Sequence, residues 1–186
     1  MITITIVLGI TTLYNIKLDI IKKILCLFLA LASFEISAQA TAKEYLNSAV
    51  SKFYLDDMKG AIVDYTKAIE IDPNYVEAYR KRGLAKEILN NFSGAIDDYT
   101  KSIEINPDYA PAYRDRGFAK DKLKDFSGAI ADYSRAIKIY PNYATAFFNR
   151  GVSKFYLGDM IGACKDARKA HELGDNASTL IKKACN

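Results

Sequence analysis

Residues of the types that carry out chemistry are few in this sequence of 186 residues, and they are not clustered. His171 is the only histidine. It stands beside Glu172 near the end of a predicted helix, where a histidine commonly interacts with the helix dipole. No group of cysteine, histidine and carboxylate residues has the spacing of a metal site. No serine or cysteine has an evident histidine base, and no glycine-rich phosphate loop precedes a helix. We therefore predict no catalytic residue, no metal site and no cofactor.

Charged residues recur instead at a fixed interval of 34 residues. They are Arg82, Arg116 and Arg150; Asp98, Asp132 and Asp166; and Lys52, Lys86, Lys120 and Lys154. If the segments that carry them are antiparallel helices, each arginine can meet an aspartate. We expect a ladder of partly buried Arg–Asp pairs. Such pairs fix geometry more surely than they add net stability, so we interpret the ladder as structural rather than functional.

The same interval governs most of the chain after residue 41. The segment Val76–Tyr109 is identical to the next one, Ala110–Tyr143, at 19 of 34 positions. Prolines at 73, 107 and 141 and Gly-Ala pairs at 60, 94, 128 and 162 keep the same spacing. A fixed period of this length is typical of an array of stacked helical repeats.

Each repeat predicts two amphipathic helices, over about 76–89 and 93–105 in the second repeat. Candidate N-caps of the second helices are Asp57, Asn91, Asp125 and Asp159, and candidate N-caps of the first helices are Asp108 and Asn142. Glycine recurs in the middle of the first helix, at Gly83, Gly117 and Gly151. Because a mid-helix glycine costs about 1 kcal/mol relative to alanine, its recurrence indicates a close approach of the second helix.

This pattern resembles the tetratricopeptide repeat, which has an aromatic residue at position 4, Gly at 8, Ala at 20, an aromatic at 24, Ala at 27 and Pro at 32. In the third repeat these are Tyr113, Gly117, Ala129, Tyr133, Ala136 and Pro141. The resemblance covers four repeats, 42–75, 76–109, 110–143 and 144–177. It implies an all-α fold, a right-handed superhelical α-solenoid. The chain departs from the family at Ser102, and at Ala167 and Asp175 in the last repeat, where an atypical end is expected.

The resemblance also implies a partner-binding concave surface formed by the first helices. Positions 5 and 9 give Leu46, Arg80, Arg114 and Phe148, and Val50, Leu84, Phe118 and Val152. Position 12 adds Phe53, Glu87, Asp121 and Phe155. A groove with an apolar floor, two central arginines and aromatic ends suits an extended or helical peptide with apolar and acidic groups. The alternative is that position 9 tilts into the helix seam and belongs to the core.

Some relatives clamp a C-terminal carboxylate with lysine, asparagine and arginine side chains. That set is not reproduced, because Pro111 and Asp115 stand where basic residues would be needed. The formal net charge is +4, with basic and acidic side chains interspersed and no basic cluster. We therefore predict a protein or peptide partner and no nucleic acid.

Residues 1–40 lie outside the repeats and read as a secretory signal peptide. Lys22 and Lys23 precede an apolar run from Ile24 to Phe34, and Ala38-Gln39-Ala40 provides small residues for cleavage, so the mature chain would start near Thr41. The first 21 residues make the segment unusually long, which fits a misassigned start. The alternative is an uncleaved anchor, the only membrane contact that we expect. The predicted location is exported, periplasmic or extracellular.

Export makes the two remaining cysteines a candidate disulfide, Cys164 with Cys185. The bridge would join the last repeat to a short C-terminal capping helix in residues 178–186, and two free thiols are the alternative. The sequence thus predicts a non-catalytic protein–protein interaction module. The other hypothesis is a structural scaffold subunit of an envelope assembly or homo-oligomer. Oligomeric state separates the two hypotheses, and the sequence favours neither state.

Overall fold

The computed structural model describes residues 21–29, 31, 37 and 41–185. The chain divides into two units, residues 1–41 and 42–186. In the first unit residues 21–29 are helical, and Cys26 is exposed. The first 20 residues and the predicted cleavage residues Ala38–Ala40 lie outside the described residues. Among the residues that are described, no helix is both long and apolar enough to cross a membrane.

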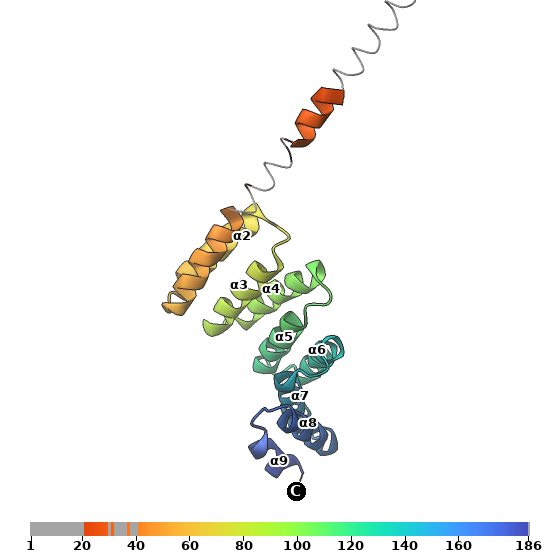
Figure 1. Ribbon diagram of the computed structural model, residues 1–186. Coiled ribbons are helices and arrows are strands. Elements are labelled where there is room, and N and C mark those ends of the chain that lie inside the picture. The colour runs from red at the N-terminus through yellow and green to blue at the C-terminus, as the bar shows by residue number, and fades with distance from the viewer. Residues whose placement is uncertain (1–20, 30, 32–36, 38–40, 186) are drawn as a thin grey trace, which may run out of the picture. The chain divides into compact units, whose positions relative to one another are not determined.

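The second unit is an array of helix pairs (Figure 1). The first helix of each pair, here called helix A, comprises helical residues 42–54, α3 (Val76–Ile88), α5 (Ala110–Lys122) and α7 (Ala144–Tyr156). The second, helix B, is α2 (Met58–Ile71), α4 (Phe92–Ile105), α6 (Phe126–Ile139) and α8 (Met160–Glu172), and α9 (Ser178–Ala184) follows. No strand occurs in the part of the chain that the structure describes. The predicted all-α helical-repeat fold is confirmed.

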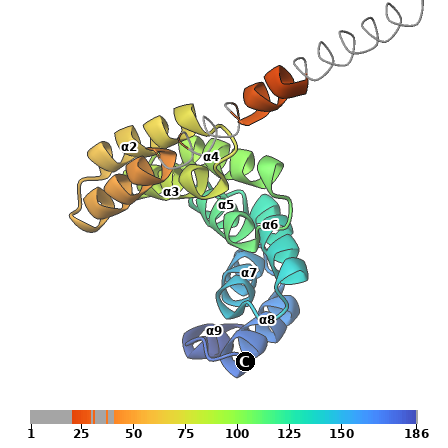
Figure 2. The ribbon, with the colours of Figure 1, turned by 45° about the horizontal axis from the view of Figure 1, so that its top comes forward.

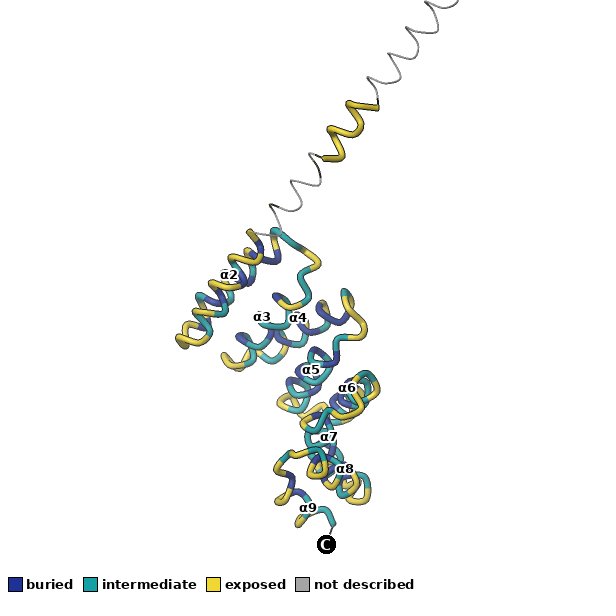
Figure 3. The backbone as a smooth tube through the Cα atoms, in the orientation of Figure 1, coloured by how far each residue is buried: buried dark blue, intermediate teal, exposed yellow. Residues whose placement is uncertain are grey.

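Within residues 42–186 the pairs follow an arc, with α3, α5 and α7 toward its inner side and α4, α6 and α8 toward its outer side (Figure 2). Each of α3, α5 and α7 packs against the helix B of its own repeat and of the preceding one. Buried stretches alternate with exposed ones along each helix (Figure 3). The core is therefore a continuous layer between neighbouring helices, in which no repeat buries its apolar side alone.

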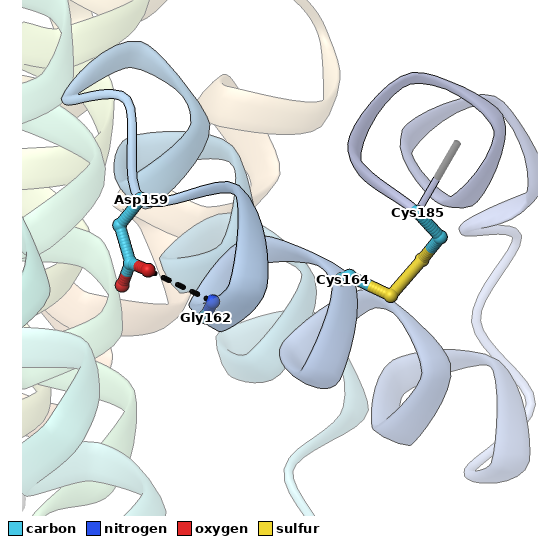
Figure 4. The surroundings of a disulfide bond; sticks show 4 residues. All are labelled: Asp159, Gly162, Cys164 and Cys185. Carbon is cyan, nitrogen blue, oxygen red and sulfur yellow. Dashed lines mark hydrogen bonds between the residues drawn. A yellow bond between two sulfur atoms is a disulfide. The ribbon is translucent and has the colours of Figure 1, made fainter.

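The helix caps are partly as predicted. The side chains of Asp57, Asn91, Asp125 and Asp159 each accept a hydrogen bond from the glycine amide three residues later, as Figure 4 shows for Asp159 and Gly162. The predicted caps Asp108 and Asn142 are wrong, because the N-cap residues are Tyr109 and Tyr143, without a side-chain hydrogen bond. The turn between helix B and the next helix A is one residue longer than predicted, so helix A begins one residue later. Its polar contact comes earlier, where the side chain of Asn106 accepts from the amide of Asp108.

Two of the recurring glycines, Gly83 and Gly117, lie directly against buried tyrosine rings. A Cβ atom added at Gly83 would lie 2.7 Å from Cε1 of Tyr99, and one at Gly117 would lie 2.8 Å from Cε1 of Tyr133. Both tyrosines are completely buried. Each ring therefore sets how closely helix B approaches helix A of its own repeat, and a Cβ atom at the glycine would require the ring or the helix to shift. In the first repeat, where Ala49 stands at this position, Tyr65 is still buried.

The last repeat solves the same packing problem in another way. Its helix B carries Ala167 where the other repeats carry tyrosine. The space over Gly151 is occupied by Leu180 of α9, whose Cδ2 atom would lie 3.1 Å from an added Cβ. The short helix α9 thus covers the end of the array with a large residue where the repeat itself has a small one. Next to this contact, the Sγ atoms of Cys164 and Cys185 lie 2.11 Å apart, the separation of a disulfide bond (Figure 4).

The predicted Arg–Asp ladder is confirmed, and it reaches across repeats. Arg116 donates two hydrogen bonds to Asp132, of 2.9 and 2.7 Å, and a third of 3.1 Å to the Thr100 hydroxyl in the preceding repeat. Lys120 adds a second cation 2.8 Å from Asp132. The same contacts recur around Arg82 and Arg150. In the first repeat, which has no preceding helix B, Ser48 replaces the arginine and donates to Asp64 at 2.6 Å.

A pair of glycine substitutions tests whether the tyrosine ring sets the helix spacing. Gly117→Ala gains up to about 1 kcal/mol of helix propensity but overpacks a rigid ring, which typically costs about 1–3 kcal/mol, so we expect net destabilisation of about 1–2 kcal/mol. Gly151→Ala meets the flexible end of Leu180 at 3.1 Å and the Ala163 carbonyl oxygen and Asp166 Cβ at 3.3 Å, which are looser contacts than the ring at Gly117, so we expect a smaller loss, below about 1 kcal/mol. Urea unfolding followed by circular dichroism measures both. Equal effects at the two positions would contradict the proposed role of the ring.

Candidate functional site

The eight residues predicted for the concave surface do not all reach it. Leu46 is only 6% exposed and packs in a core cluster with Ala49 and Met58, so it offers no surface to a ligand. The other seven are partly exposed on helix A. Val50 also packs against that first cluster, and Phe148 and Val152 pack against the cluster under α9. Position 9 thus belongs partly to the seam and partly to the surface, which combines the two interpretations of the sequence.

Six of these residues line two clefts. The cleft between repeats 1 and 2 has a volume of about 200 Å³ and is lined by Val50, Phe53, Tyr54, Tyr65, Arg80, Lys81 and Leu84. The cleft between repeats 3 and 4 has a volume of about 470 Å³ and is lined by Phe118, Asp121, Lys122, Lys124, Phe126, Phe148, Asn149, Val152 and Tyr156. Both use positions 9, 12 and 13 of one helix A and positions 5, 6 and 9 of the next. They are therefore the same structural site, repeated two units apart.

Between the clefts, the helices of repeats 2 and 3 meet in a polar centre. Asp115, which is 2% exposed, accepts from Arg80 at 2.7 Å and pairs with Arg114 at 2.8 Å. The hydroxyl oxygens of Tyr109 and Tyr143 accept further hydrogen bonds from the two arginines, at 3.0 and 3.3 Å. The two central arginines, which the sequence offered as ligands for acidic groups, thus share an internal carboxylate.

Two carboxylates of position 12 face the buried tyrosines. The Tyr99 hydroxyl donates to Glu87 at 3.0 Å, and the Tyr133 hydroxyl donates to Asp121 at 2.8 Å. Burial raises the pKa of Glu87 to about 7, although the hydrogen bond from Tyr99 lowers it. Burial likewise raises the pKa of Asp121, against hydrogen bonds from Tyr133 and Ser153. At neutral pH the inner face therefore carries less negative charge than its sequence suggests.

Sequence reasoning missed five residues of the larger cleft: Asn149 at position 6, and Lys122, Lys124, Phe126 and Tyr156. The last four occupy positions 13, 15 and 17, at the end of helix A or the start of helix B. The alignment of the repeats shows that these positions vary. It does not show that the ends of the helices border the cleft, so the variation could not be linked to a site. In the sequence, Asp115 stood out only because it does not fit the carboxylate clamp. Its ion pair with Arg80 of the preceding repeat was not predicted.

A larger hollow, of about 620 Å³, lies beside α7 and α8, next to Cys164. Its charged residues are largely engaged, since Arg150 pairs with Asp166 and Lys169 with Glu172. It contains part of the ladder rather than residues of positions 5 and 9. His171 is exposed, and its Nδ1 atom lies 3.4 Å from the carbonyl oxygen of Asp175. Within the described ranges, no group of histidine, cysteine and carboxylate residues could hold a metal ion.

An arc of stacked helix pairs with clefts between successive inner helices defines a helical-repeat module for binding other proteins. Models of this repeat match the chain directly. One, described as TPR repeat, matches residues 52–87 and 122–158, and another, described as tetratricopeptide repeat, matches residues 76–109. Together they cover just over half of the chain, which belongs to the tetratricopeptide-repeat family. The chain is accordingly a non-catalytic interaction module.

Solved structures agree with this assignment. The crystal structure of MamA is 26% identical, with a TM-score of 0.72, over 77% of this chain and 80% of that one. The first TPR domain of Spaghetti (RPAP3), bound to the HSP90 peptide SRMEEVD, is 26% identical, with a TM-score of 0.64, over 64% and 95%. The Arabidopsis OM64 TPR domain, 24% identical with a TM-score of 0.63 over 64% and 98%, shares the fold. No match was found among the curated proteins.

The raised pKa of Glu87 predicts a pH-dependent stability. Because the folded value of about 7 exceeds the ordinary 4.5, its contribution to stability is complete below about pH 4.5 and is lost as the pH rises through 7. Glu87→Gln keeps the acceptor for Tyr99 without the charge. We expect the variant to match the parent at pH 4.5 and to exceed it at pH 8 by on the order of 1–2 kcal/mol, after discounting for solvent screening.

Urea unfolding at the two pH values measures this difference. The matched control is Glu70→Gln, an exposed carboxylate on α2, which should change stability equally at both pH values. A Glu87→Gln variant with the parent's full pH dependence would show that this carboxyl group is ionised in the folded protein near its ordinary pKa.

Proposed function

We propose that this chain binds a segment of another protein along the inner side of its A helices. The observation that carries the proposal is the pair of clefts at equivalent repeat positions, separated by the polar centre around Asp115. Two clefts in register, the larger mainly apolar and the smaller about equally polar and apolar, suit an extended or helical segment that places one side chain in each. The peptide-bound TPR domain of Spaghetti (RPAP3) supports the proposal, since it is a similar domain that holds a peptide.

The mode of binding differs from a carboxylate clamp. Arg80 and Arg114 already share Asp115, and breaking that arrangement would leave a buried carboxylate without a partner. The polar centre therefore acts as a rigid divider between the clefts. Binding energy comes mainly from apolar side chains entering the clefts, and an acidic group of the partner is bound elsewhere on the inner side.

Charge placed in the clefts tests this surface. The double variant Leu84→Asp with Phe118→Asp puts a carboxylate into each cleft at a partly exposed position. We expect proteins that crosslink to the parent chain in its own cell envelope to be lost by at least tenfold, as for the central residues of an interface. Val63→Asp, at a 52% exposed position on α2, is the matched control and should leave capture unchanged. Equal loss in control and cleft variant, or no loss in either, would count against the inner side.

We also propose that the chain is exported and that residues 1–40 are a cleaved signal peptide. The pattern of charged, apolar and small residues supports this, and so does the position of Cys164 and Cys185 at disulfide distance, because such bridges persist in oxidising compartments. The bridge would hold α9, and with it Leu180, over the open end of the last repeat. The alternative is an uncleaved segment that anchors the chain to a membrane.

Mass spectrometry of the protein recovered from its host distinguishes these outcomes. We expect a mature chain that starts near Thr41 and whose two cysteines react with iodoacetamide only after reduction. An intact chain of 186 residues in the membrane fraction would support the anchor instead. Two thiols that react without reduction would end the disulfide proposal.

A scaffold subunit that associates with itself is the second candidate. One observation favours it: at position 17 Met58 is buried beneath the next repeat, whereas Met160 at the end of the array is 43% exposed, beside Ile161, which is 87% exposed. Light scattering separates the two candidates. Concentration-dependent oligomers that are unaffected by Leu84→Asp with Phe118→Asp would favour the scaffold, and a monomer would favour the binding module.

A further inference from the structure

The cleft between repeats 3 and 4 departs from the pattern of the other repeats at two positions, and both departures are lysines. Position 13 holds Tyr54, Ile88 and Tyr156 in the other repeats, and position 15 holds Asp56, Asn90 and Gly158. Repeat 3 has Lys122 and Lys124 instead. Both line the larger cleft, and both are exposed. Comparison with the other three repeats therefore identifies these two lysines as specific to repeat 3.

Lys124 is kept at a position that disfavours it. The backbone at position 15 is left-handed in all four repeats, with φ of 65° at Asp56, 60° at Asn90, 63° at Lys124 and 82° at Gly158. Aspartate, asparagine and glycine tolerate this conformation, whereas a long side chain such as lysine is rarely found there. A strained residue on an accessible surface suggests a role in binding rather than in folding.

The positive charge of these lysines is only weakly compensated within the protein, because Lys122 acts on Asp121 and Glu87 through space without forming an ion pair. Among the residues that the structure describes, neither ammonium group forms an ion pair, and the Lys122 Nζ lies over the Phe118 ring, 4.8 Å from its centroid. The nearby carboxylate of Asp121 is engaged by Tyr133 and Ser153. In the smaller cleft, by contrast, Arg80 pairs with Asp115, and Lys81 pairs with Glu77.

The wall below the lysines is apolar and shaped by rings. Phe118, Phe148 and Val152 line it, and the rings of Phe126 and Tyr156 stack at one end, with centroids 5.0 Å apart and planes inclined by 12°. The volume of about 470 Å³ falls within the roughly 300–1,000 Å³ of ligand pockets. The cleft can therefore hold a bulky side chain while both ammonium groups remain at its rim.

We propose that the cleft between α5 and α7 binds a peptide segment in which an aromatic or leucine side chain lies within two residues of aspartate or glutamate. The apolar side chain lies against Phe118 and Phe148, and the acidic group pairs with Lys122 and Lys124. This inference rests on the proposed function and adds the chemistry of the partner to it. Complementary charge at the rim gives specificity and faster association, and the apolar contact gives most of the affinity.

Selection from a phage library of random 12-residue peptides on the full chain tests the inference. We expect enrichment of peptides with Phe, Tyr or Leu within two residues of Asp or Glu. The best of these, labelled with fluorescein, should bind at least tenfold more weakly to the double variant Lys122→Ser with Lys124→Asn, and its affinity should fall with added salt. Lys59→Ser, an exposed lysine of α2 outside both clefts, is the matched control and should bind like the parent.

Lys124→Asn alone provides a readout that a structural role would not give. Asparagine is the residue of repeat 2 at this position and tolerates the left-handed backbone, so we expect a higher unfolding midpoint together with weaker peptide binding. A loss of stability in this variant would show that the lysine serves the fold, and would overturn the inference.

The remaining outcomes are decisive as well. Enriched peptides without acidic residues, or binding that the double lysine variant leaves unchanged, would overturn the proposed chemistry. The absence of any enriched peptide would also overturn it. The proposed function would then still stand if folded partners are captured by the parent chain and lost from the Leu84→Asp with Phe118→Asp variant.

Discussion

A tyrosine ring lying on a glycine determines the helix spacing in the two central repeats. Tyr99 on Gly83 and Tyr133 on Gly117 set the distance between the two helices of a repeat. Each Arg–Asp pair lies within one repeat, and its arginine also donates a hydrogen bond to a hydroxyl of the preceding repeat. Their hydrogen bonds leave no buried carboxylate unpaired, so the ladder holds orientation rather than adding large net stability. Stacking then follows, since no pair of helices buries its apolar side alone.

The two ends of the array show what this constraint demands when a neighbour is missing. In the first repeat the position of the ladder arginine is Ser48, because there is no earlier helix B whose hydroxyl the arginine could reach. In the last repeat the tyrosine becomes Ala167, and Leu180 of α9 fills the volume instead. The large side chain thus comes from α9 and the small one from helix B. Both changes keep the core filled while altering which helix fills it.

Much of the fold could be predicted because its signals are local and periodic. Glycine, tyrosine and the capping residues Asp57 and Asp125 recur at one interval, and each acts within its own repeat. The failures involve geometry between repeats. Leu46 is buried because it faces the first core cluster rather than the inner side. Asp115 binds Arg80 of the preceding repeat, a contact that depends on the rotation from one repeat to the next and on no sequence interval.

The same separation of roles explains why the candidate site was only partly predictable. Positions that maintain the spacing are nearly uniform, so variation collects at positions 5, 6, 9, 12, 13 and 15, along the inner side. At the centre of that side, two arginines face Asp115 and a Glu87 whose pKa is raised to about 7. Asp115 balances one of the two arginines, and the raised pKa leaves Glu87 only partly ionised, so this centre keeps a net positive charge at neutral pH. Lys122 and Lys124 add to this positive field at the larger cleft, where neither forms an ion pair among the described residues, so acidic recognition extends from the middle of the groove to that cleft.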